Sequence, residues 1–158
     1  MRKPHFLISA AWLLQAAAWF LPAVNVFDIR PVGWEAFLAT FSSVWLSKGA
    51  GYETWYAPLL AGVTALTTFF FIVGSPWVVF RGSPSLRRNS ARLATAAFVF
   101  NAHWLIFGIL NLSELRVGYL FWWFSFAILA IGLFDLAGRD NAAESVTKTT
   151  GSGAKITV

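Results

Sequence analysis

The chain is 158 residues long, 58% of them hydrophobic and only 12% charged, with a formal net charge of +5. Soluble domains carry about 25% charged residues, so this composition excludes an ordinary soluble fold and indicates a membrane protein. There are no cysteines, which excludes disulfides, thiol redox chemistry and cysteine-based metal sites.

Four apolar runs, separated by connectors that carry nearly all of the charge, predict an all-α integral membrane protein with a bundle of four transmembrane helices. A helix rises about 1.5 Å per residue, so roughly 20 apolar residues cross a hydrocarbon core of about 30 Å. Each run reaches that length, and we expect one transmembrane domain over residues 1–138. Its transmembrane helices are predicted over residues 6–26, 55–79, 92–112 and 117–137.

The first run, residues 6–26, follows the basic residues at positions 2 and 3 and carries Gln15 near its middle. A secretory signal peptide cleaved after Ala18 is the alternative, because Ala16, Ala17 and Ala18 form a small-residue site. The apolar run continues well beyond this site, so we expect a retained transmembrane helix.

The long connector of residues 27–53 contains an amphipathic pattern. Apolar residues recur at helical spacing, and small or polar residues fill the opposite face. The pattern predicts an outer helix over residues 33–46, lying in the headgroup region or over the mouth of the bundle. It either covers helix ends or offers a binding surface, whose aromatic residues are Trp34, Phe37, Phe41 and Trp45.

The predicted helix of residues 55–79 has two local features. Ala57, Ala61 and Ala65 recur every four residues, and small residues at that spacing let a neighbouring helix approach closely. We include them in the candidate interaction surface. Near the end of this helix, the sequence Gly74-Ser75-Pro76 predicts a kink or a loosened last turn.

Residues 81–92 are expected to form the inner loop, with Ser90 as the N-cap of the next helix. This loop is the densest basic patch of the chain and the candidate site for anionic lipid headgroups. The basic residues of the patch are Arg81, Arg87, Arg88 and Arg92.

Residues 113–116 form a very short connector, so the last two helices are expected to pack as an antiparallel hairpin. Asp135 and Arg139 have the i, i+4 spacing of an ion pair on a helix surface. The polar, Gly- and Thr-rich composition of residues 139–158 predicts a disordered tail.

Lys and Arg are enriched in cytoplasmic connectors, and their distribution predicts that both termini are cytoplasmic. The predicted outer segments hold three basic residues, Arg30, Lys48 and Arg116. The predicted inner segments hold nine, which are Arg2, Lys3, Arg81, Arg87, Arg88, Arg92, Arg139, Lys148 and Lys155. For a short chain rich in Ala and Trp, we expect the bacterial inner membrane.

Polar side chains inside a bilayer are costly, so each is a candidate functional group. Gln15, Asn101 and His103 are all predicted near the midplane and form the candidate intramembrane polar cluster. The structural interpretation is an inter-helix hydrogen bond between Gln15 and one of the other two, which would fix the packing. The functional hypothesis is that His103 carries protons or contacts a ligand.

Motifs for catalysis and cofactor binding are missing from the sequence. A bis-histidine haem needs two His at one depth, whereas His5 is predicted at the surface and His103 in the centre. No histidine–carboxylate set predicts a metal site, and Ser75 lacks the Gly-x-Ser-x-Gly setting of a nucleophile. We therefore expect a protein that is not an enzyme, with no cofactor, no metal and no nucleic acid partner.

The favoured function is binding within the bilayer, as an accessory or regulatory subunit or as an immunity-type protein. The expected partners are membrane lipids, and another membrane protein or a second copy of this chain. The alternative is a small transporter or channel working as a homo-oligomer, and a lipid-modifying enzyme is the third reading. The polar path of the transporter would contain Gln15, Asn101, His103 and Thr64, Thr67 or Thr68.

Overall fold

The computed structural model describes residues 4–24, 30–38, 57–103, 105 and 116–152. Over this part of the chain the fold is all-helical without strands, and one isolated backbone bridge pairs Pro22 with Val32. The helices are α1 (Pro4–Phe20), α3 (Ala57–Phe69), the π-helical segment η1 (Phe70–Gly74), α4 (Ser75–Arg81), α5 (Pro84–Asn101) and α7 (Val117–Ser152).

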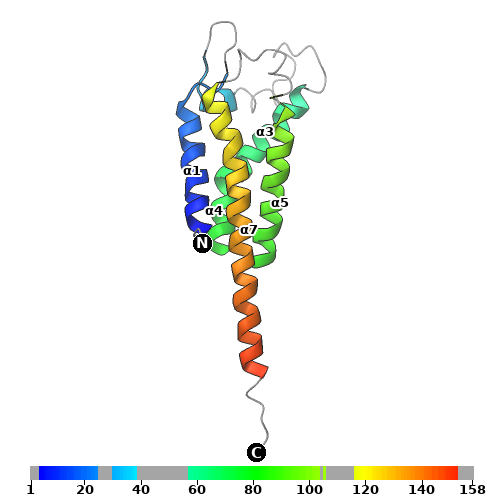
Figure 1. Ribbon diagram of the computed structural model, residues 1–158. Helices are drawn as coiled ribbons and strands as arrows, with labels where there is room; N and C mark the ends of the chain where they lie inside the picture. Colours follow the sequence, from blue (N-terminus) through cyan, green and yellow to red (C-terminus); the bar gives the residue numbers. More distant parts are fainter. Residues whose placement is uncertain (1–3, 25–29, 39–56, 104, 106–115, 153–158) are drawn as a thin grey trace, which may run out of the picture.

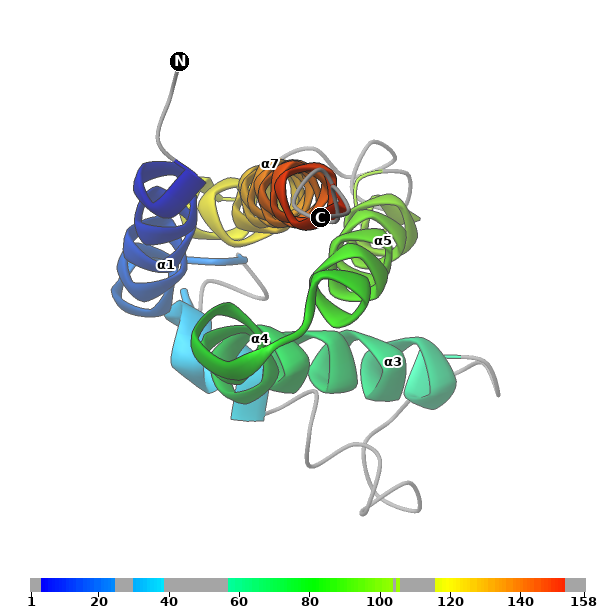
Figure 2. The same ribbon diagram turned by 90° about the horizontal axis from the view of Figure 1, so that it is seen from below.

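The segments α3, η1 and α4 follow one another without a break and form a single rod. This rod lies side by side with the rods formed by α1, α5 and α7 (Figure 1). The α7 helix packs along α1 on one side and along α5 on the other. Seen from below, the α3–η1–α4 rod completes the group (Figure 2). Successive rods run in opposite directions, as the short connector between α5 and α7 predicts. We call the end with the start of α1 and the α4–α5 turn the terminal end, and the other the loop end.

Two helical stretches, Leu59–Arg81 and Val117–Ala143, are long and apolar enough to cross a membrane, by length and composition alone. The other two rods do not meet the same test. The α1 helix has 17 residues, about 26 Å, and the first half of α5 is rich in polar and charged residues. Two of the four predicted crossings are therefore supported.

The predicted kink at Gly74-Ser75-Pro76 is present as the π-helical turn η1. Proline has no N–H and its ring clashes with the carbonyl four residues earlier, so a regular α-helix cannot pass it unchanged. The N–H of Ser75 bonds to the carbonyl of Phe70, five residues back. The Ser75 hydroxyl donates to the Phe71 carbonyl at 2.5 Å, the acceptor that the missing N–H of Pro76 would serve in this register.

The α5 helix begins at Pro84, so the prediction of a loop over residues 81–92 with Ser90 as the N-cap is wrong. The N-cap is Ser83, whose hydroxyl accepts from the N–H of Leu86 at 3.3 Å. Pro84 takes the first turn, where its missing N–H costs little. The loop was predicted from its charged residues. Charged residues mark where a chain leaves an apolar environment, but they do not end a helix.

Other helix ends differ from the apolar runs for the same reason. The α1 helix ends at Phe20 and not at residue 26, because the residue before Pro22 disfavours the α conformation. The α7 helix continues through Ser152, which differs from the predicted disorder of residues 139–158. Polar residues after Gly138 suit a helix in water, although they do not suit a bilayer.

Two predicted segments are described only in part. Residues 33–38 are helical, whereas residues 39–46 of the expected outer amphipathic helix lie outside the described residues. The α5 helix ends at Asn101, and residues 106–112 of the predicted third helix also lie outside them.

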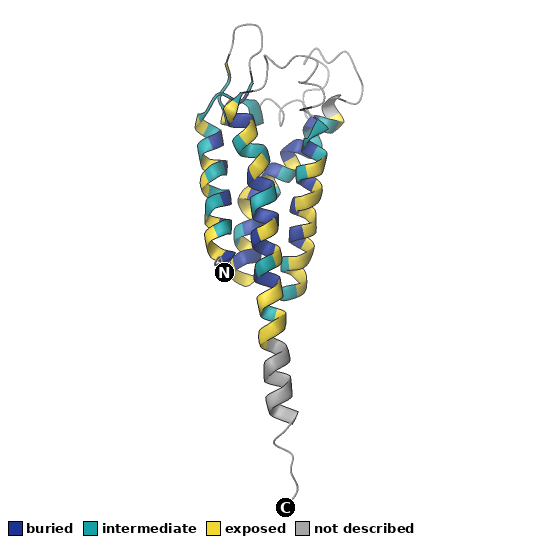
Figure 3. Cartoon of the chain, viewed as in Figure 1, coloured by how far each residue is buried: buried dark blue, intermediate teal, exposed yellow. Residues whose placement is uncertain are grey.

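Buried residues lie along the inner faces of the helices and exposed ones along their outer faces (Figure 3). Small and polar residues are numerous among the buried ones, beside large residues such as Phe71 and Phe126, and many large apolar residues are exposed. Buried residues include Ala11, Ala61, Ala91, Ala94, Ser75 and Ser125. Exposed residues include Leu13, Leu66, Phe69, Trp77 and Phe80. Helices associate in lipid through close packing of small residues, whereas a surface of this kind would aggregate in water.

Gly132 permits a close approach of α1 to α7. A Cβ at this position would lie 2.8 Å from Cγ1 of Ile8 and 3.3 Å from Cβ of Leu7. Both distances are shorter than the 3.5 to 4.0 Å of an optimal carbon–carbon contact. The α1–α7 seam is therefore held by backbone proximity, which only glycine allows here.

Candidate functional site

Asn101, the last residue of α5, forms a closed set of hydrogen bonds with α3 and α7. Its Oδ1 accepts from the Thr64 hydroxyl at 2.9 Å, and its Nδ2 donates to the Thr67 hydroxyl at 3.1 Å. The Thr67 hydroxyl itself donates to the Thr64 carbonyl, so it must accept from Asn101, which assigns Nδ2 to that side. The Asn101 carbonyl accepts from the Tyr119 hydroxyl at 2.7 Å. Asn101 therefore joins α5 to α3 through its side-chain amide and to α7 through its main-chain carbonyl.

The next turn of the same seam is closed in a similar way. The Thr68 hydroxyl accepts from Trp122 Nε1 at 3.1 Å and donates to the Thr64 carbonyl at 2.9 Å. Trp123 donates to the Phe98 carbonyl at 2.8 Å, and the two rings stack with centroids 4.4 Å apart. These polar groups bond to one another and not to an open path.

His103 lies just beyond the end of α5, at the loop end. Its Nδ1 is 2.6 Å from the Phe100 carbonyl, and its ring is 4.9 Å from the Phe100 ring. Gln15 pairs instead with Ser125 of α7, six residues or about 9 Å beyond Tyr119 along the helix. The predicted polar residues thus lie at two levels, and Gln15 does not join the other two.

The buried amide of Gln15, 4% exposed, has an incomplete set of hydrogen bonds. The Ser125 hydroxyl lies 2.8 Å from Gln15 Oε1 and 2.6 Å from the Trp122 carbonyl, but its single hydrogen serves one of them at a time. Gln15 Nε2 is buried without a hydrogen-bond partner in the described part of the chain. Turning the amide over would pair Nε2 with Ser125 and leave Oε1 unpaired. In either orientation one amide atom lacks a partner.

An open groove with a volume of about 330 Å³ lies between α1 and the η1–α4 part of the rod. Trp12 and Trp19 are two helical turns apart on one face of α1, with Gln15 and Ala16 between them. The Trp12 indole N–H donates to the Ser75 hydroxyl at 3.0 Å, so this ring presents only apolar surface to the groove. The lining residues are Trp12, Gln15, Ala16, Trp19 and Phe20 of α1, and Phe71, Ile72 and Pro76 of the rod.

The predicted interaction surface is divided between the inside and the outside of the molecule. Phe37 is half-buried and stacks on Trp19, with centroids 5.7 Å apart and an interplanar angle of 27°, whereas Trp34 is exposed. Ala61 and Ala65 are buried, so this part of the small-residue face is used within the protein. Phe41, Trp45 and the side chain of Ala57 lie outside the described residues.

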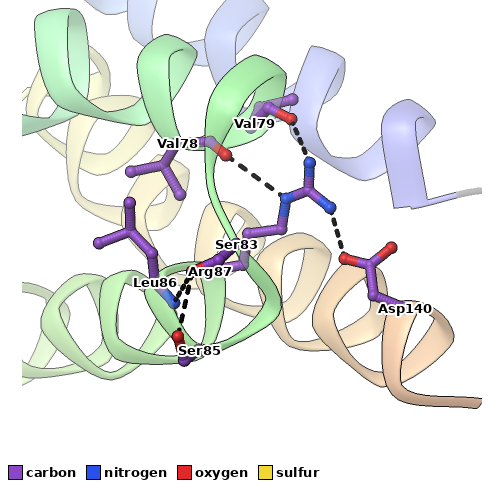
Figure 4. A network of polar contacts seen from close by, with 7 residues as sticks. All are labelled: Val78, Val79, Ser83, Ser85, Leu86, Arg87 and Asp140. Atoms are coloured by element: carbon purple, nitrogen blue, oxygen red, sulfur yellow. Dashed lines mark hydrogen bonds and ion pairs between the residues drawn. The ribbon is translucent and has the colours of Figure 1, made fainter. Parts of the chain in front are cut away.

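Arg87 of the basic patch is bound inside the protein (Figure 4). Its guanidinium pairs with Asp140 of α7, and it donates to the carbonyls of Val78 at 3.4 Å and Val79 at 2.9 Å. These carbonyls belong to the last turn of α4, and that of Val78 also accepts from the N–H of Gly82 at 2.9 Å. Arg87 thus closes the end of α4 and joins it to α7. The sequence pattern offers no signal for this pairing with a residue 53 positions away.

The other basic residues of the patch, Arg81, Arg88 and Arg92, are exposed. The Arg81 guanidinium lies 5.5 Å from the centre of the Trp77 ring, a cation–π contact. Arg92 Nη1 donates to Asn89 Oδ1 at 3.5 Å. The exposed arginines remain compatible with the predicted binding of anionic lipid.

The predicted ion pair between Asp135 and Arg139 is confirmed, with Nη2 and Oδ2 3.2 Å apart. No group of three or more His, Cys, Asp or Glu side chains that could hold a metal ion lies within the described ranges.

No family model, no curated protein and no solved structure matches this chain.

Proposed function

We propose that this protein crosses the bacterial inner membrane with four helices, both termini in the cytoplasm, and acts without catalysis by binding another membrane protein within the bilayer. It would be an accessory or regulatory subunit, or an immunity-type protein. The observation that carries the proposal is the contrast between hydrogen-bonded polar groups inside and an apolar surface between the two ends. The orientation rests on the nine basic residues of the predicted inner segments against three in the outer ones.

The α3–η1–α4 rod offers a continuous apolar stripe for such a partner. Its residues recur at intervals of three, four or seven, which places them on one face, and each is more than half exposed. No charged residue interrupts positions 57–80. The stripe extends over about 32 Å, the thickness of a hydrocarbon core. Its residues are Leu59, Leu66, Phe69, Val73, Trp77 and Phe80.

A transporter or channel formed by several copies is the second candidate. It requires polar side chains that face a path, whereas Asn101, Thr64, Thr67 and Thr68 bond to one another between α3, α5 and α7. Gln15 favours this candidate, because its incompletely bonded amide lines an open groove. Most of the polar groups that the path would need are already used, so we prefer partner binding.

Site-specific photocrosslinking in the native membrane tests the proposal. A photoreactive phenylalanine analogue at Phe69 samples the stripe, and the same analogue at Phe124 of α7 is the matched control on another exposed apolar face. We expect a defined crosslink to a different protein from Phe69 and none from Phe124. Crosslinks from Phe69 to a second copy would favour the homo-oligomer, and lipid adducts alone would reject partner binding.

Single-cysteine labelling tests the crossing of the membrane separately, since the chain has no cysteine of its own. Ser85→Cys lies in the first turn of α5 and Arg30→Cys in the predicted outer connector, and both positions are exposed. We expect an impermeant maleimide added outside to label Arg30→Cys and not Ser85→Cys. The opposite pattern would reverse the orientation, and equal labelling would contradict the crossing.

A further inference from the structure

One outer face of α5 is charged in its first turns and apolar after them. Arg88 and Arg92 are four residues apart and both are exposed, so their side chains are neighbours on this face. Thr95 and Val99 follow at seven and eleven residues from Arg88 and are also exposed, which continues the same face toward the loop end. The Thr95 hydroxyl already donates to the Ala91 carbonyl at 3.0 Å. The face therefore has a cationic part and an adjoining part that needs no polar partner.

The two arginines of this face form no ion pair within the described residues. The ion pairs found there use Asp135 and Asp140, which bind Arg139 and Arg87. No Asp or Glu occurs at positions 54–113, so neither α5 nor the adjacent rod supplies another acid. The cationic part of the face therefore keeps its charge for a group from outside the chain.

The height of the charged face distinguishes it from an ordinary basic loop. The α4 and α5 helices run in opposite directions and are joined by a turn of two residues (Figure 1). Arg92 lies eight residues after the start of α5, and Val73 lies eight residues before the end of α4, so both backbones are about 12 Å from the turn. Val73 is 53% exposed. An exposed arginine and an exposed apolar residue thus lie at the same height on neighbouring rods.

A phospholipid with a net negative headgroup matches this face in chemistry and in order. Guanidinium groups bind phosphate oxygens through charge-assisted hydrogen bonds. If the helices cross a membrane, the acyl chains of such a lipid extend from its phosphate toward the midplane, as Thr95 and Val99 extend from the two arginines. A free phosphate would use only the charged part of the face, so the apolar continuation favours the lipid.

We infer that this face of α5 binds one anionic phospholipid, with the phosphate held by Arg88 and Arg92 and an acyl chain lying along Thr95 and Val99. The inference rests on the proposed crossing of the membrane. It requires neither the protein partner nor a particular orientation of the chain.

The test is native mass spectrometry of the full-length protein, released from micelles that contain equal amounts of phosphatidylglycerol and phosphatidylcholine. We expect one phosphatidylglycerol to remain bound in preference to phosphatidylcholine. Arg88→Gln with Arg92→Gln should weaken its binding at least about ten-fold. The matched control is Arg81→Gln with Arg139→Gln, which removes the same charge from exposed arginines that already contact Trp77 and Asp135. The control should change binding by less than about two-fold.

Three results would overturn the inference. Equal weakening by the two pairs of substitutions would reduce the effect to net charge. Inorganic phosphate that displaces the lipid at the lipid's own concentration would make the site one for a free anion. Equal retention of the two lipids by the unmodified protein would leave the arginines without a lipid role.

The variants are compared with the unmodified protein in thermal unfolding. If the double variant does not fold, Arg88→Gln alone provides the test, with Arg81→Gln as its control. Retained phosphatidylglycerol without a crosslink from Phe69 would reject the proposed partner and leave the lipid site standing. A crosslink without a preference for phosphatidylglycerol would reject the lipid site and support the partner.

Discussion

The two sides of α7 close their helix seams in different ways. On the side of α5 and α3, both polar side-chain atoms of Asn101 bond to threonines of α3, and Tyr119 of α7 donates to the Asn101 carbonyl. On the side of α1, the seam depends on Gly132, and the pair of Gln15 with Ser125 leaves one amide atom unpaired beside a groove. The difference shows that polarity between helices does not by itself tell whether both amide atoms are paired, because that depends on the partners that the packing supplies.

The largest expected effect is on the α1 seam. Gly132→Leu would press a side chain against Ile8 and separate α1 from α7, and we expect a loss of about 3 kcal/mol in unfolding free energy. Reversible unfolding in mixed detergent micelles measures it. Gly138→Leu is the matched control, because a Cβ there has nothing within 4 Å, and it should be neutral or slightly stabilising. Equal losses in both variants would mean that α1 does not approach α7 as described.

The complete hydrogen bonds of the α5 seam predict the next effect. Asn101→Leu keeps a similar shape but removes both side-chain bonds to α3, and we expect a loss of about 2 kcal/mol in the same unfolding measurement. Asn89→Leu, at an exposed position of the same helix, should change stability by less than about 0.5 kcal/mol. A neutral Asn101→Leu would show that the polar seam is not a structural tie.

At the terminal end, Arg87→Met should cost about 1 kcal/mol, because Asp140 and the end of α4 lose a shared partner. Arg88→Met removes the same charge from the exposed neighbouring position and should be neutral. A double-mutant cycle with Asp140→Asn in unfolding experiments should give a coupling energy above about 0.5 kcal/mol. A coupling of zero would reduce Arg87 to an ordinary surface arginine.

The smallest expected effect separates the two kinds of polar residue. Gln15→Met should change the free energy of unfolding by less than about 0.5 kcal/mol, because the bond lost to Ser125 is offset by removal of an unpaired amide. The same denaturation assay with Ser125→Ala is the control for the loss of that bond alone. If Gln15→Met were as destabilising as Asn101→Leu, the Gln15 amide would be a structural tie of the same kind as Asn101.

The local features of the fold follow from neighbouring residues and were predicted well. Proline after Gly74-Ser75 changes the helical register within one turn, and Asp135 reaches Arg139 because four residues complete a turn. Helix ends were predicted less well, since apolar runs report the solvent around a helix and not its backbone bonds. The Ser83–Pro84 signal for the start of α5 was present in the sequence but was outweighed by the surrounding charge.

The site itself depends on pairs that are far apart in the chain. Three residues were singled out from their polarity and expected depth, yet that reasoning could not distinguish Asn101, which meets Thr64 and Thr67, from Gln15, which meets Ser125. Nor could it separate Arg87 from the exposed Arg88, because the difference lies in the position of Asp140.

The apolar runs thus determine that the chain is helical, and Gly74-Ser75-Pro76 marks the turn that deviates, whereas the helix ends at Phe20 and Pro84 do not follow from the runs. Which polar groups are satisfied, which alanines face inward and where a groove opens were decided only when the rods packed. The reason is physical. Helical bonds and turns connect residues at most five positions apart, whereas Ser125 lies 110 positions from Gln15, and Ser75 lies 63 from Trp12. Only the tertiary arrangement brings such pairs within hydrogen-bond distance.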